Sequence, residues 1–391
     1  MKIALQIIII AFHLLNLNGQ VRYDLQMMVE GRLRETIVVI PSKAPPTGGY
    51  PIVVMLHGTS QDGPQFYDIS GWKELGEEEN FITVFPTSLR WCYLDDGIEE
   101  ISRRWVNGNV TDNPCSGTPQ NYVSDVHFLK LLVQKIADTF QVNKAMIFAS
   151  GFSNGSAMVQ KLAMDAGDVF AACAGSGGFL PMGDSTKPLN RIPVWLMLGT
   201  NDDRHIRPPY TEIPFGGDSL LAYFKGPLNR LLVCQGLTEN YTKFETSITH
   251  SYEFSESQPG EEGMLFRFTL IQDMFHIYPT EFNSRINAPR LFWEFFKNSV
   301  AVANSSLNNT KAEVRIYPNP SNDIVTVDLK NFTEAKPIYI LVFNSVGICT
   351  ASKKLINQTH VNISKNEIGT GLFILQISQG SKFGTQTFCF N

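Results

Sequence analysis

The sequence predicts an α/β fold for residues 20–300 and a small all-β, sandwich-like domain for residues 312–391. In the first part, short apolar runs typical of buried strands alternate with stretches whose apolar residues recur at helical spacing. In the second part only strand-like runs occur, separated by Gly and Asn. The stretch 301–311 is small and polar and has little apolar surface to bury, so it is predicted to be a linker.

The composition indicates a folded chain and excludes one class of partner. At roughly 150 residues per domain, a length of 391 residues predicts two to three domains. Hydrophobic residues make up 43% and charged residues 18%, so the chain is neither disordered nor highly charged. The net charge of −5 leaves no basic surplus to neutralise a phosphate backbone. Nucleic acid is therefore not expected as a partner.

Residues 1–19 have the layout of a signal peptide. A cation at Lys2 precedes an apolar run over 3–15, and a polar end follows up to Gly19. A membrane anchor is the alternative, but the run is shorter than the ~20 apolar residues that span a bilayer, and no other long apolar stretch follows. We therefore expect cleavage near Gly19, secretion, and no membrane span in the mature chain.

The cysteines fit an oxidising compartment, where disulfides form. None has the C-x-x-C spacing that indicates zinc. Four precede residue 300 and two follow it, which is compatible with pairing inside each domain, and three connectivities remain open for the first four. Buried free thiols are the alternative to disulfides. The six cysteines are Cys92, Cys115, Cys173, Cys234, Cys349 and Cys389.

Strands and helices of the first domain are expected in alternation along the chain. A hairpin around Gly31 opens it, and each later apolar run ends at a turn signal. The expected strands are 24–29, 35–40, 52–56, 81–85, 144–149, 194–198 and 264–271. The expected helices are 65–79, 124–140 with Ser124 as N-cap, 156–164 and 288–298. The irregular segment 91–122 is long for a connection, and a substrate lid and a disulfide-pinned surface loop both fit it.

A G-x-S-x-G pentapeptide, residues 151–155, stands between the strand 144–149 and the helix 156–164. In a strand–turn–helix context this motif is a nucleophile elbow, which exposes the central serine on a sharp turn. A plain Gly-rich turn is the alternative. We therefore predict that Ser153 is a catalytic nucleophile.

A serine hydroxyl needs an imidazole to take its proton, and the imidazole needs a carboxylate to orient it. In folds with this elbow the acid and then the histidine follow the serine, at the ends of later strands. The strand 194–198 ends in GTNDD, so Asp202 is the predicted acid, with Asp203 as the reserve and a simple turn aspartate as the alternative.

Four histidines follow Asp202, and elimination selects one as the base. His205 lies on the same loop as the acid, His360 belongs to the second domain, and His250 sits in a polar, alternating stretch typical of an exposed strand. His276 follows the strand 264–271 and precedes the helix 288–298, which is the position expected of the base. A satisfied structural histidine is the alternative.

Two backbone amides are expected to stabilise an oxyanion at this serine. One belongs to Asn154, the residue after the predicted nucleophile. The other is expected from 57–59 after an early strand, with the amide of Thr59, or else that of Gly58, as the donor. A simple strand-ending turn is the alternative for this loop.

Six runs together resemble a known group of enzymes: PIVVMLHGTSQDG, FITVFPTS, GFSNGSAM, VFAACAGSGG, GTNDD and MFHIYP. They are similar to the secreted esterases grouped with polyhydroxybutyrate depolymerases and feruloyl esterases, over about residues 35–300. The resemblance implies an α/β-hydrolase fold with Ser153, Asp202 and His276 as the catalytic residues. It implies esters as substrates: polyhydroxyalkanoates, or feruloylated or acetylated cell-wall polysaccharides.

The second domain resembles the C-terminal sorting domain of the bacterial type IX secretion system, over about residues 313–391. The runs VRIYPNP, VFNSVGI and GTGLFILQIS carry this resemblance. It implies the type IX secretion machinery as a partner and an extracellular or outer-membrane location. An unrelated β-sandwich that binds carbohydrate is the alternative.

The sequence therefore predicts an exported serine ester hydrolase with a sorting tail. No cluster of His, Cys or carboxylate side chains has metal-ligand spacing, so neither a metal nor an organic cofactor is expected. A serine peptidase on the same fold, and a polysaccharide-binding homologue without turnover, are the alternatives.

Overall fold

The computed structural model of the chain describes residues 19–95, 97–108, 111, 113–116, 120–180, 188, 190–206, 211–215, 222–306, 310–332, 337–345, 349–356, 358–379 and 382–391. The predicted signal peptide, except for Gly19, lies outside the described residues. The chain divides into two compact units. The first takes in most residues up to Phe296, and the second takes in the residues from Lys297 on together with Phe244–Ser251.

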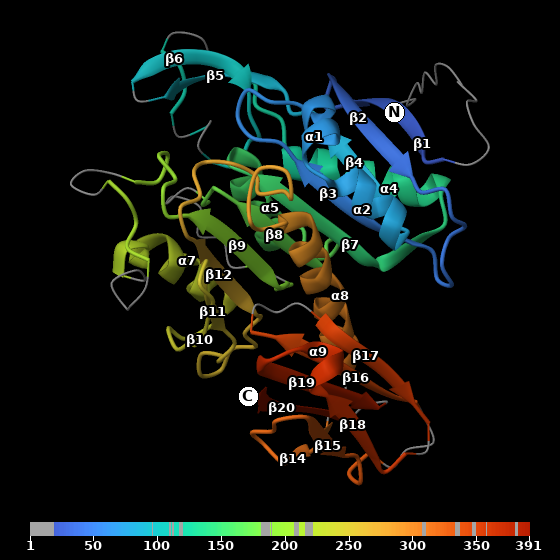
Figure 1. The fold of residues 1–391 in the computed structure, drawn as a ribbon. Helices are drawn as coiled ribbons and strands as arrows, with labels where there is room; N and C mark the ends of the chain where they lie inside the picture. The colour runs from blue at the N-terminus through green and yellow to red at the C-terminus, as the bar shows by residue number, and fades with distance from the viewer. Residues whose placement is uncertain are drawn as a thin grey trace. The chain divides into compact units, whose positions relative to one another are not determined.

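A large mixed sheet forms the centre of the first unit, with strand order β1-β2-β4-β3-β7-β8-β9-β12-β11-β10 (Figure 1). The strands β2 and β4 pair antiparallel, and from β4 to β12 all neighbouring strands run parallel. The predicted hairpin is β1 with β2. The strands are β1 (Val21–Val29), β2 (Arg32–Ile40), β3 (Tyr50–Leu56), β4 (Ile82–Pro86), β7 (Val142–Phe152), β8 (Ala172–Ser176), β9 (Val194–Gly199), β10 (Thr242–Glu245), β11 (Thr249–Phe254) and β12 (Phe266–Ile271).

Helices cover both faces of this sheet: α2 and α8 lie on one face, and α4 and α5 lie on the other (Figure 1). Stacked aromatic rings join the first pair to the sheet, since Phe296 of α8 stacks on Trp72 of α2 and on Phe148 of β7. This arrangement, with parallel strands at its centre, is the predicted α/β-hydrolase fold. The helices are α1 (Gly63–Ile69), α2 (Trp72–Glu79), α4 (Asp125–Thr139), α5 (Asn154–Asp165), α7 (Lys225–Gln235) and α8 (Ala288–Ser306).

Two helices differ from their predicted bounds. The single helix expected over 65–79 is two helices, because Gly71 adopts a left-handed conformation with φ +76° and interrupts the helical hydrogen bonds. The last helix runs to Ser306, beyond the predicted end at residue 298, because no Gly or Pro lies between Pro289 and Ser306 to stop it earlier. Its last turns occupy part of the stretch expected to be a linker. The Ser124 N-cap has the expected contact, with its hydroxyl accepting the His127 amide hydrogen bond.

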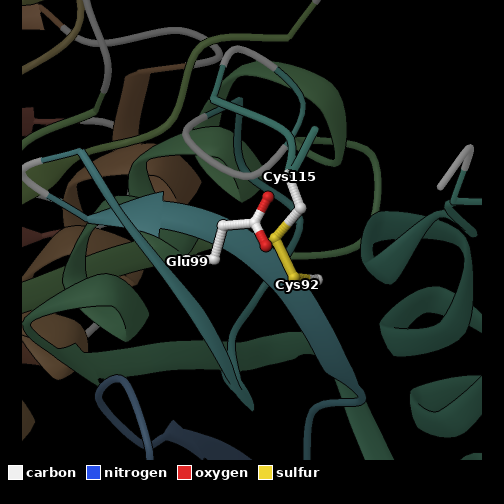
Figure 2. A group of neighbouring side chains, drawn as sticks. All are labelled: Cys92, Glu99 and Cys115. Carbon is white, nitrogen blue, oxygen red and sulfur yellow. A yellow bond between two sulfur atoms is a disulfide. The ribbon is translucent and has the colours of Figure 1, made fainter. Parts of the chain in front are cut away.

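The segment 91–122 is pinned to itself rather than open. It begins in a hairpin of β5 (Arg90–Asp95) and β6 (Ile98–Arg103), and a disulfide joins Cys92 to Cys115 across a Cα separation of 5.6 Å. Figure 2 shows the Glu99 carboxylate beside this disulfide. That carboxylate accepts hydrogen bonds from the Ser116 amide and hydroxyl at 2.9 and 2.8 Å. The disulfide expected of the second alternative is therefore present, and the lid role stays a prediction.

The prediction that the cysteines pair inside each domain is wrong for three of the others. Cys173 and Cys234 are buried and form no disulfide, and Cys389 of the second unit forms none either. Cys173 lies in the middle of β8 with no exposed surface, where a thiol packs as a small apolar group. Burial also raises the pKa of its thiol, so the reactive thiolate is suppressed. The side chain of Cys349 lies outside the described residues.

From Thr310 on, the described residues of the second unit are all-β apart from one short helix, as predicted. A five-stranded sheet, β13-β20-β19-β16-β17, and a three-stranded sheet, β14-β15-β18, enclose an apolar core that includes Val325, Ile340 and Leu375. Its elements are β13 (Thr310–Lys311), β14 (Arg315–Tyr317), β15 (Ile324–Asp328), β16 (Ile338–Asn344), β17 (Cys349–Leu355), β18 (His360–Ser364), α9 (Lys365–Ile368), β19 (Gly371–Gln379) and β20 (Lys382–Phe390). Within the described residues, no helix is both long and apolar enough to span a bilayer.

Candidate active site

The predicted elbow is a sharp turn between β7 and α5. Ser153 has φ +52° and ψ −117°. Residues other than glycine rarely adopt this backbone conformation, which costs about 1–3 kcal/mol. The flanking glycines permit it, because a Cβ at Gly151 would overlap the carbonyl of Gly155, and a Cβ at Gly155 would overlap the carbonyl of Leu56. The Ser153 amide donates to the Ser176 carbonyl at 2.8 Å, which ties the turn to β8.

The structure brings Ser153, His276 and Asp202 together in one series of hydrogen bonds. The His276 Nε2 atom lies 2.9 Å from the Ser153 hydroxyl, and Nδ1 lies 2.9 Å from both Asp202 carboxylate oxygens. Since a carboxylate only accepts, the Nδ1–H donates to Asp202 and Nε2 accepts from Ser153. The Asp202 side chain is fully buried, whereas that of His276 is 16% exposed. The ring can therefore exchange a proton with a bound molecule.

Main-chain contacts between two loops fix the distance from the acid to the histidine. Asp202 follows β9 and His276 follows β12, and these strands are parallel neighbours. The Thr200 amide donates to Ile271 at 2.9 Å, and the Thr200 hydroxyl accepts from the amide of Asp273 at 2.7 Å. A Cβ at Gly199 would overlap the carbonyl of Met274, so only glycine lets the loops approach this closely.

The reserve acid, His250 and His360 make no contact with the predicted base in the described part of the chain. Asp203 is exposed on the same turn, and Asp202, not Asp203, contacts His276. His250 is on β11 and is only 9% exposed, so the expectation of an exposed strand there is wrong: His250, Tyr252 and Phe254, which alternate along the strand on one face, are all buried. His360 begins β18 of the second unit and is exposed.

The two amides predicted as oxyanion donors belong to segments next to Ser153. The loop after β3 passes close to the serine, since a Cβ at Gly58 would lie 3.2 Å from the Ser153 Cβ. The Gly58 amide is already used, because it donates to the Gln61 side chain at 2.9 Å. Within the described part of the chain, the amides of Thr59 and Asn154 make no such hydrogen bond. Asn154 is also the first residue of α5, where the helix dipole favours negative charge.

A buried neutral histidine holds the first of these loops. The His57 ring is fully buried, with Nδ1 donating to the Gly58 carbonyl at 2.7 Å and Nε2 accepting from the Ser88 amide at 3.0 Å. Burial lowers the pKa of His57 to about 4, so the ring is neutral at pH 7 and can make both contacts at once.

The stretch 103–107 begins at the last residue of β6 and contacts both amide loops, which sequence reasoning missed. The Trp105 indole N–H donates to the His57 carbonyl at 2.8 Å, and its main-chain amide donates to the Asn154 side chain at 2.6 Å. The Asn107 side chain donates to the Asn154 carbonyl at 3.1 Å, and Arg103 accepts from the amide of Ser60 at 2.9 Å. We call this stretch the 103–107 brace. Its only sequence signal was a tryptophan in a segment too long for a plain connection.

A buried ion pair anchors the brace to the rest of the unit. The Arg34 guanidinium of β2 pairs with Asp125 at the start of α4, and both side chains are at most 1% exposed. The second oxygen of Asp125 accepts from the Val106 amide at 2.7 Å. Because one carboxylate serves both contacts, removing it would leave a buried cation and free the middle of the brace.

Two groups of side chains in the described part of the chain have the composition and spacing of a metal site. The first, Cys92, Glu99 and Cys115, offers no thiolate because its cysteines form the disulfide in Figure 2. The second is Asp202, His205 and His276, whose ligand atoms lie within 4.8 Å of one another. The sequence did not show it, because 71 residues separate the two histidines.

Comparison with known proteins identifies the second unit. Residues 315–391 match the family model of the secretion system C-terminal sorting domain. This confirms the predicted sorting domain, and it marks the chain as a secreted protein.

Sequence relatives of the chain include proteins named as esterases. The chain is 24% identical over 182 residues to a bifunctional acetylxylan esterase/xylanase, XynS20E, of Neocallimastix patriciarum, which covers 44% of this chain and 22% of that protein. It is 25% identical over 179 residues to a candidate esterase, NocK, of Nocardia uniformis subsp. tsuyamanensis, covering 45% of this chain and 47% of that protein. The chain thus spans less than half the length of either relative.

Among solved structures, the acetyl xylan esterase from Aspergillus awamori is similar, with a TM-score of 0.45 and 14% identity over 63% of this chain and 90% of that one. The class of the first unit follows from its own topology and elbow: it is an α/β-hydrolase fold, joined here to a secretion sorting domain.

Proposed function

We propose that this secreted protein is a serine carboxylic-ester hydrolase that works through an acyl-enzyme at Ser153. One observation supports this most directly: the continuous hydrogen-bond series from the Ser153 hydroxyl through His276 to the buried carboxylate of Asp202. A serine so connected has a base for its proton and an anion to balance the imidazolium that forms.

Acylation begins when the Ser153 oxygen attacks the ester carbonyl carbon and its proton passes to Nε2 of His276. The Asp202 carboxylate stabilises the imidazolium across the Nδ1 hydrogen bond. The carbonyl oxygen becomes an oxyanion and accepts hydrogen bonds from the amides of Thr59 and Asn154. The C–O bond to the alcohol then breaks, and the alcohol leaves with the proton from Nε2.

Deacylation uses the same groups with water as the nucleophile. His276 takes a proton from a water molecule, which attacks the acyl carbon on Ser153. The second tetrahedral intermediate collapses, the carboxylic acid leaves, and the proton returns to the Ser153 oxygen. No other group is needed to balance the reaction.

The choice of Thr59 as the second amide donor rests on which amides are occupied. The Gly58 amide would have to give up its bond to Gln61 before it could reach a substrate. The Thr59 amide needs no such exchange, and its loop is held on one side by the His57 ring and on the other by the Ser60 contact to Arg103. A donor held in place before the reaction lowers the barrier most, because no reorganisation is needed.

As substrates we propose acyl esters of extracellular polymers: acetyl or feruloyl esters of plant polysaccharides, or polyhydroxyalkanoate-type esters. The export of the chain favours a substrate outside the cell, and the name of the Neocallimastix relative favours acetylated xylan among these. The type IX secretion machinery is the proposed partner in export.

The nucleophile is tested with a fluorophosphonate probe and with p-nitrophenyl acetate turnover. We expect the wild-type protein to be labelled and Ser153→Ala not to be, with turnover reduced by a factor of roughly 10³ or more. The matched control is Ser247→Ala, which removes an exposed serine that precedes β11. Labelling of Ser153→Ala at the wild-type rate would contradict the assignment.

The reaction class and the substrate are tested together on one panel. Acetylated xylan, methyl ferulate, a short polyhydroxybutyrate and a dipeptide anilide are incubated with wild-type protein and Ser153→Ala. We expect Ser153-dependent release of acid from at least one of the esters and none from the anilide. Ser153-dependent cleavage of the anilide alone would make the protein a peptidase.

A further inference from the structure

The Asp202–His205–His276 group has the composition of a transition-metal site, with two imidazoles and one carboxylate. One ligand atom of each residue lies within 4.8 Å of the other two. Borderline cations such as Zn²⁺ prefer imidazole with carboxylate, whereas Mg²⁺ and Ca²⁺ prefer oxygen ligands alone. The proposed reaction uses Asp202 and His276 but gives no role to His205.

The turn after β9 places His205 next to the predicted base. The amides of His205 and Ile206 both donate to the Asp202 carbonyl at 3.0 Å, which folds the chain back toward the acid. The His205 and His276 rings have centroids 6.2 Å apart. The Nε2 of His205 lies 3.1 Å from the Gly177 carbonyl, and a Cβ at Gly177 would lie 3.2 Å from the His276 ring.

We infer that Asp202, His205 and His276 bind a zinc ion that inhibits the enzyme. The inference rests on the proposed function, because the ring that zinc captures is the proposed base. Zinc bonds to imidazole nitrogen at 2.0–2.1 Å and to carboxylate oxygen at 2.0–2.2 Å, so tetrahedral ligand atoms stand about 3.3 Å apart. The 4.8 Å limit therefore requires only a small turn of the His205 ring, which is partly exposed, and water completes the coordination.

Zinc at this site stops proton transfer, because Asp202 faces Nδ1 of His276 and an ion bound by both residues must take that nitrogen. It displaces the proton from the hydrogen bond to Asp202, and the single proton of the neutral ring moves to Nε2. That nitrogen then cannot accept the proton of Ser153. Nothing is oxidised or reduced, and removing the ion restores the base.

The experiment measures ester turnover by the full chain against zinc concentration, with Mg²⁺ as the control ion and a chelator to reverse the effect. We expect zinc, but not Mg²⁺, to inhibit the wild-type protein reversibly. His205→Asn removes one ligand and should raise the half-inhibitory zinc concentration by at least about 10-fold, with turnover in the absence of zinc unchanged. His205→Cys offers a thiolate instead and should keep the inhibition.

The matched control is His127→Asn, which removes an exposed histidine of α4 and should leave zinc sensitivity as in the wild type. Equal sensitivity of wild type and His205→Asn would overturn the inference, because zinc would then act without this site. So would a wild-type protein that zinc does not inhibit.

A binding measurement separates this inference from the proposed function. Titration calorimetry of zinc into Ser153→Ala, which needs no turnover, should show one site that is lost in the double variant Ser153→Ala/His205→Asn. If this site is present while no ester is hydrolysed by the wild type, the proposed function fails and the metal site stands. If esters are hydrolysed and the calorimetry shows no site that depends on His205, the metal site fails alone.

Discussion

Two regions meet at Ser153, and their residues take part in the proposed reaction in different ways. The loops after β7, β9 and β12 supply the three side chains that exchange protons and charge. The 103–107 brace supplies none of these side chains, but it contacts both segments that carry the proposed oxyanion donors. The reacting side chains thus come from strand ends. The two amide segments are held by Trp105, which lies 48 residues from His57 and 49 residues from Asn154 in sequence.

The difference teaches why the two regions should respond differently to substitution. Removal of a reacting group abolishes a step, so the rate falls by orders of magnitude. Loss of a contact in the brace leaves every reacting group present and only loosens an amide donor. The rate should then fall less, because only part of the free energy with which that donor stabilises the transition state is lost. The three predictions below test this contrast, from the largest expected effect to the smallest.

The largest effect is expected at the acid. Asp202→Asn should lower kcat by about 10³–10⁴, because an amide favours the wrong imidazole tautomer and cannot balance the imidazolium. Asp203→Asn is the matched control, since Asp203 is exposed on the same turn. It should leave kcat unchanged. The measurement is p-nitrophenyl ester turnover at saturating substrate, and the reverse ranking of the two variants would exchange their roles.

The first region could be predicted from sequence because each of its residues follows a local rule. The G-x-S-x-G run between an apolar strand and a helix located Ser153, and the end of the apolar run 194–198 located Asp202. Parallel strands place their carboxyl ends at one edge of the sheet, so residues 74 positions apart, Asp202 and His276, were expected to be neighbours. The α/β alternation and the all-β second unit followed from periodicity in the same way.

The 103–107 brace and the Asp202–His205–His276 group could not be predicted from the sequence. Each depends on contacts between distant segments, which the spacing of apolar residues does not reveal. Trp105 is one of several aromatic residues in an irregular segment, and its partners, the His57 carbonyl and the Asn154 side chain, lie far from it in sequence. His205 was set aside because it shares a loop with Asp202, and only the turn after β9 shows that this brings it toward His276. Cys173 was misjudged for a related reason: a cysteine in a buried strand has the same sequence signal as one in a disulfide.

The second prediction concerns pH and the buried ring behind the first amide loop. The pKa of His57 is lowered to about 4 in the folded protein, below an ordinary value of about 6.5 in the unfolded chain. Only the unfolded chain therefore binds this proton as pH falls from 6.5 to 4, and the free energy of unfolding decreases over that window. The loss amounts to about 3 kcal/mol in total and is absent above pH 7.

Urea unfolding of the wild-type protein and of His57→Gln at several pH values measures this contribution. The glutamine can accept from the Ser88 amide but does not titrate, so its free energy of unfolding should depend less on pH than that of the wild type between pH 6.5 and 4. At pH 7.5 the difference between their free energies of unfolding should contain no contribution from the protonation of His57. Parallel pH profiles would show that His57 is not protonated on unfolding in this range.

The smallest effect is expected in the brace itself, and it isolates one hydrogen bond. Trp105→Phe removes the indole N–H that donates to the His57 carbonyl while keeping an aromatic ring in a fully buried position. We expect kcat to fall about 10-fold, which corresponds to about 1.4 kcal/mol, because the Thr59 amide is less firmly held against the oxyanion. KM should change little, since the ground-state ester is neutral at that oxygen.

Trp91→Phe is the matched control, because it makes the same change in the same segment. The Trp91 indole N–H is buried and has no hydrogen-bond partner among the described residues. Its removal therefore breaks no hydrogen bond and should leave both kcat and KM as in the wild type. A fall in kcat for Trp105→Phe but not for Trp91→Phe, with similar melting temperatures, would tie the effect to the contact with His57. If both variants lose activity and stability in parallel, the indole N–H of Trp105 has no separate role and the brace acts only by filling space.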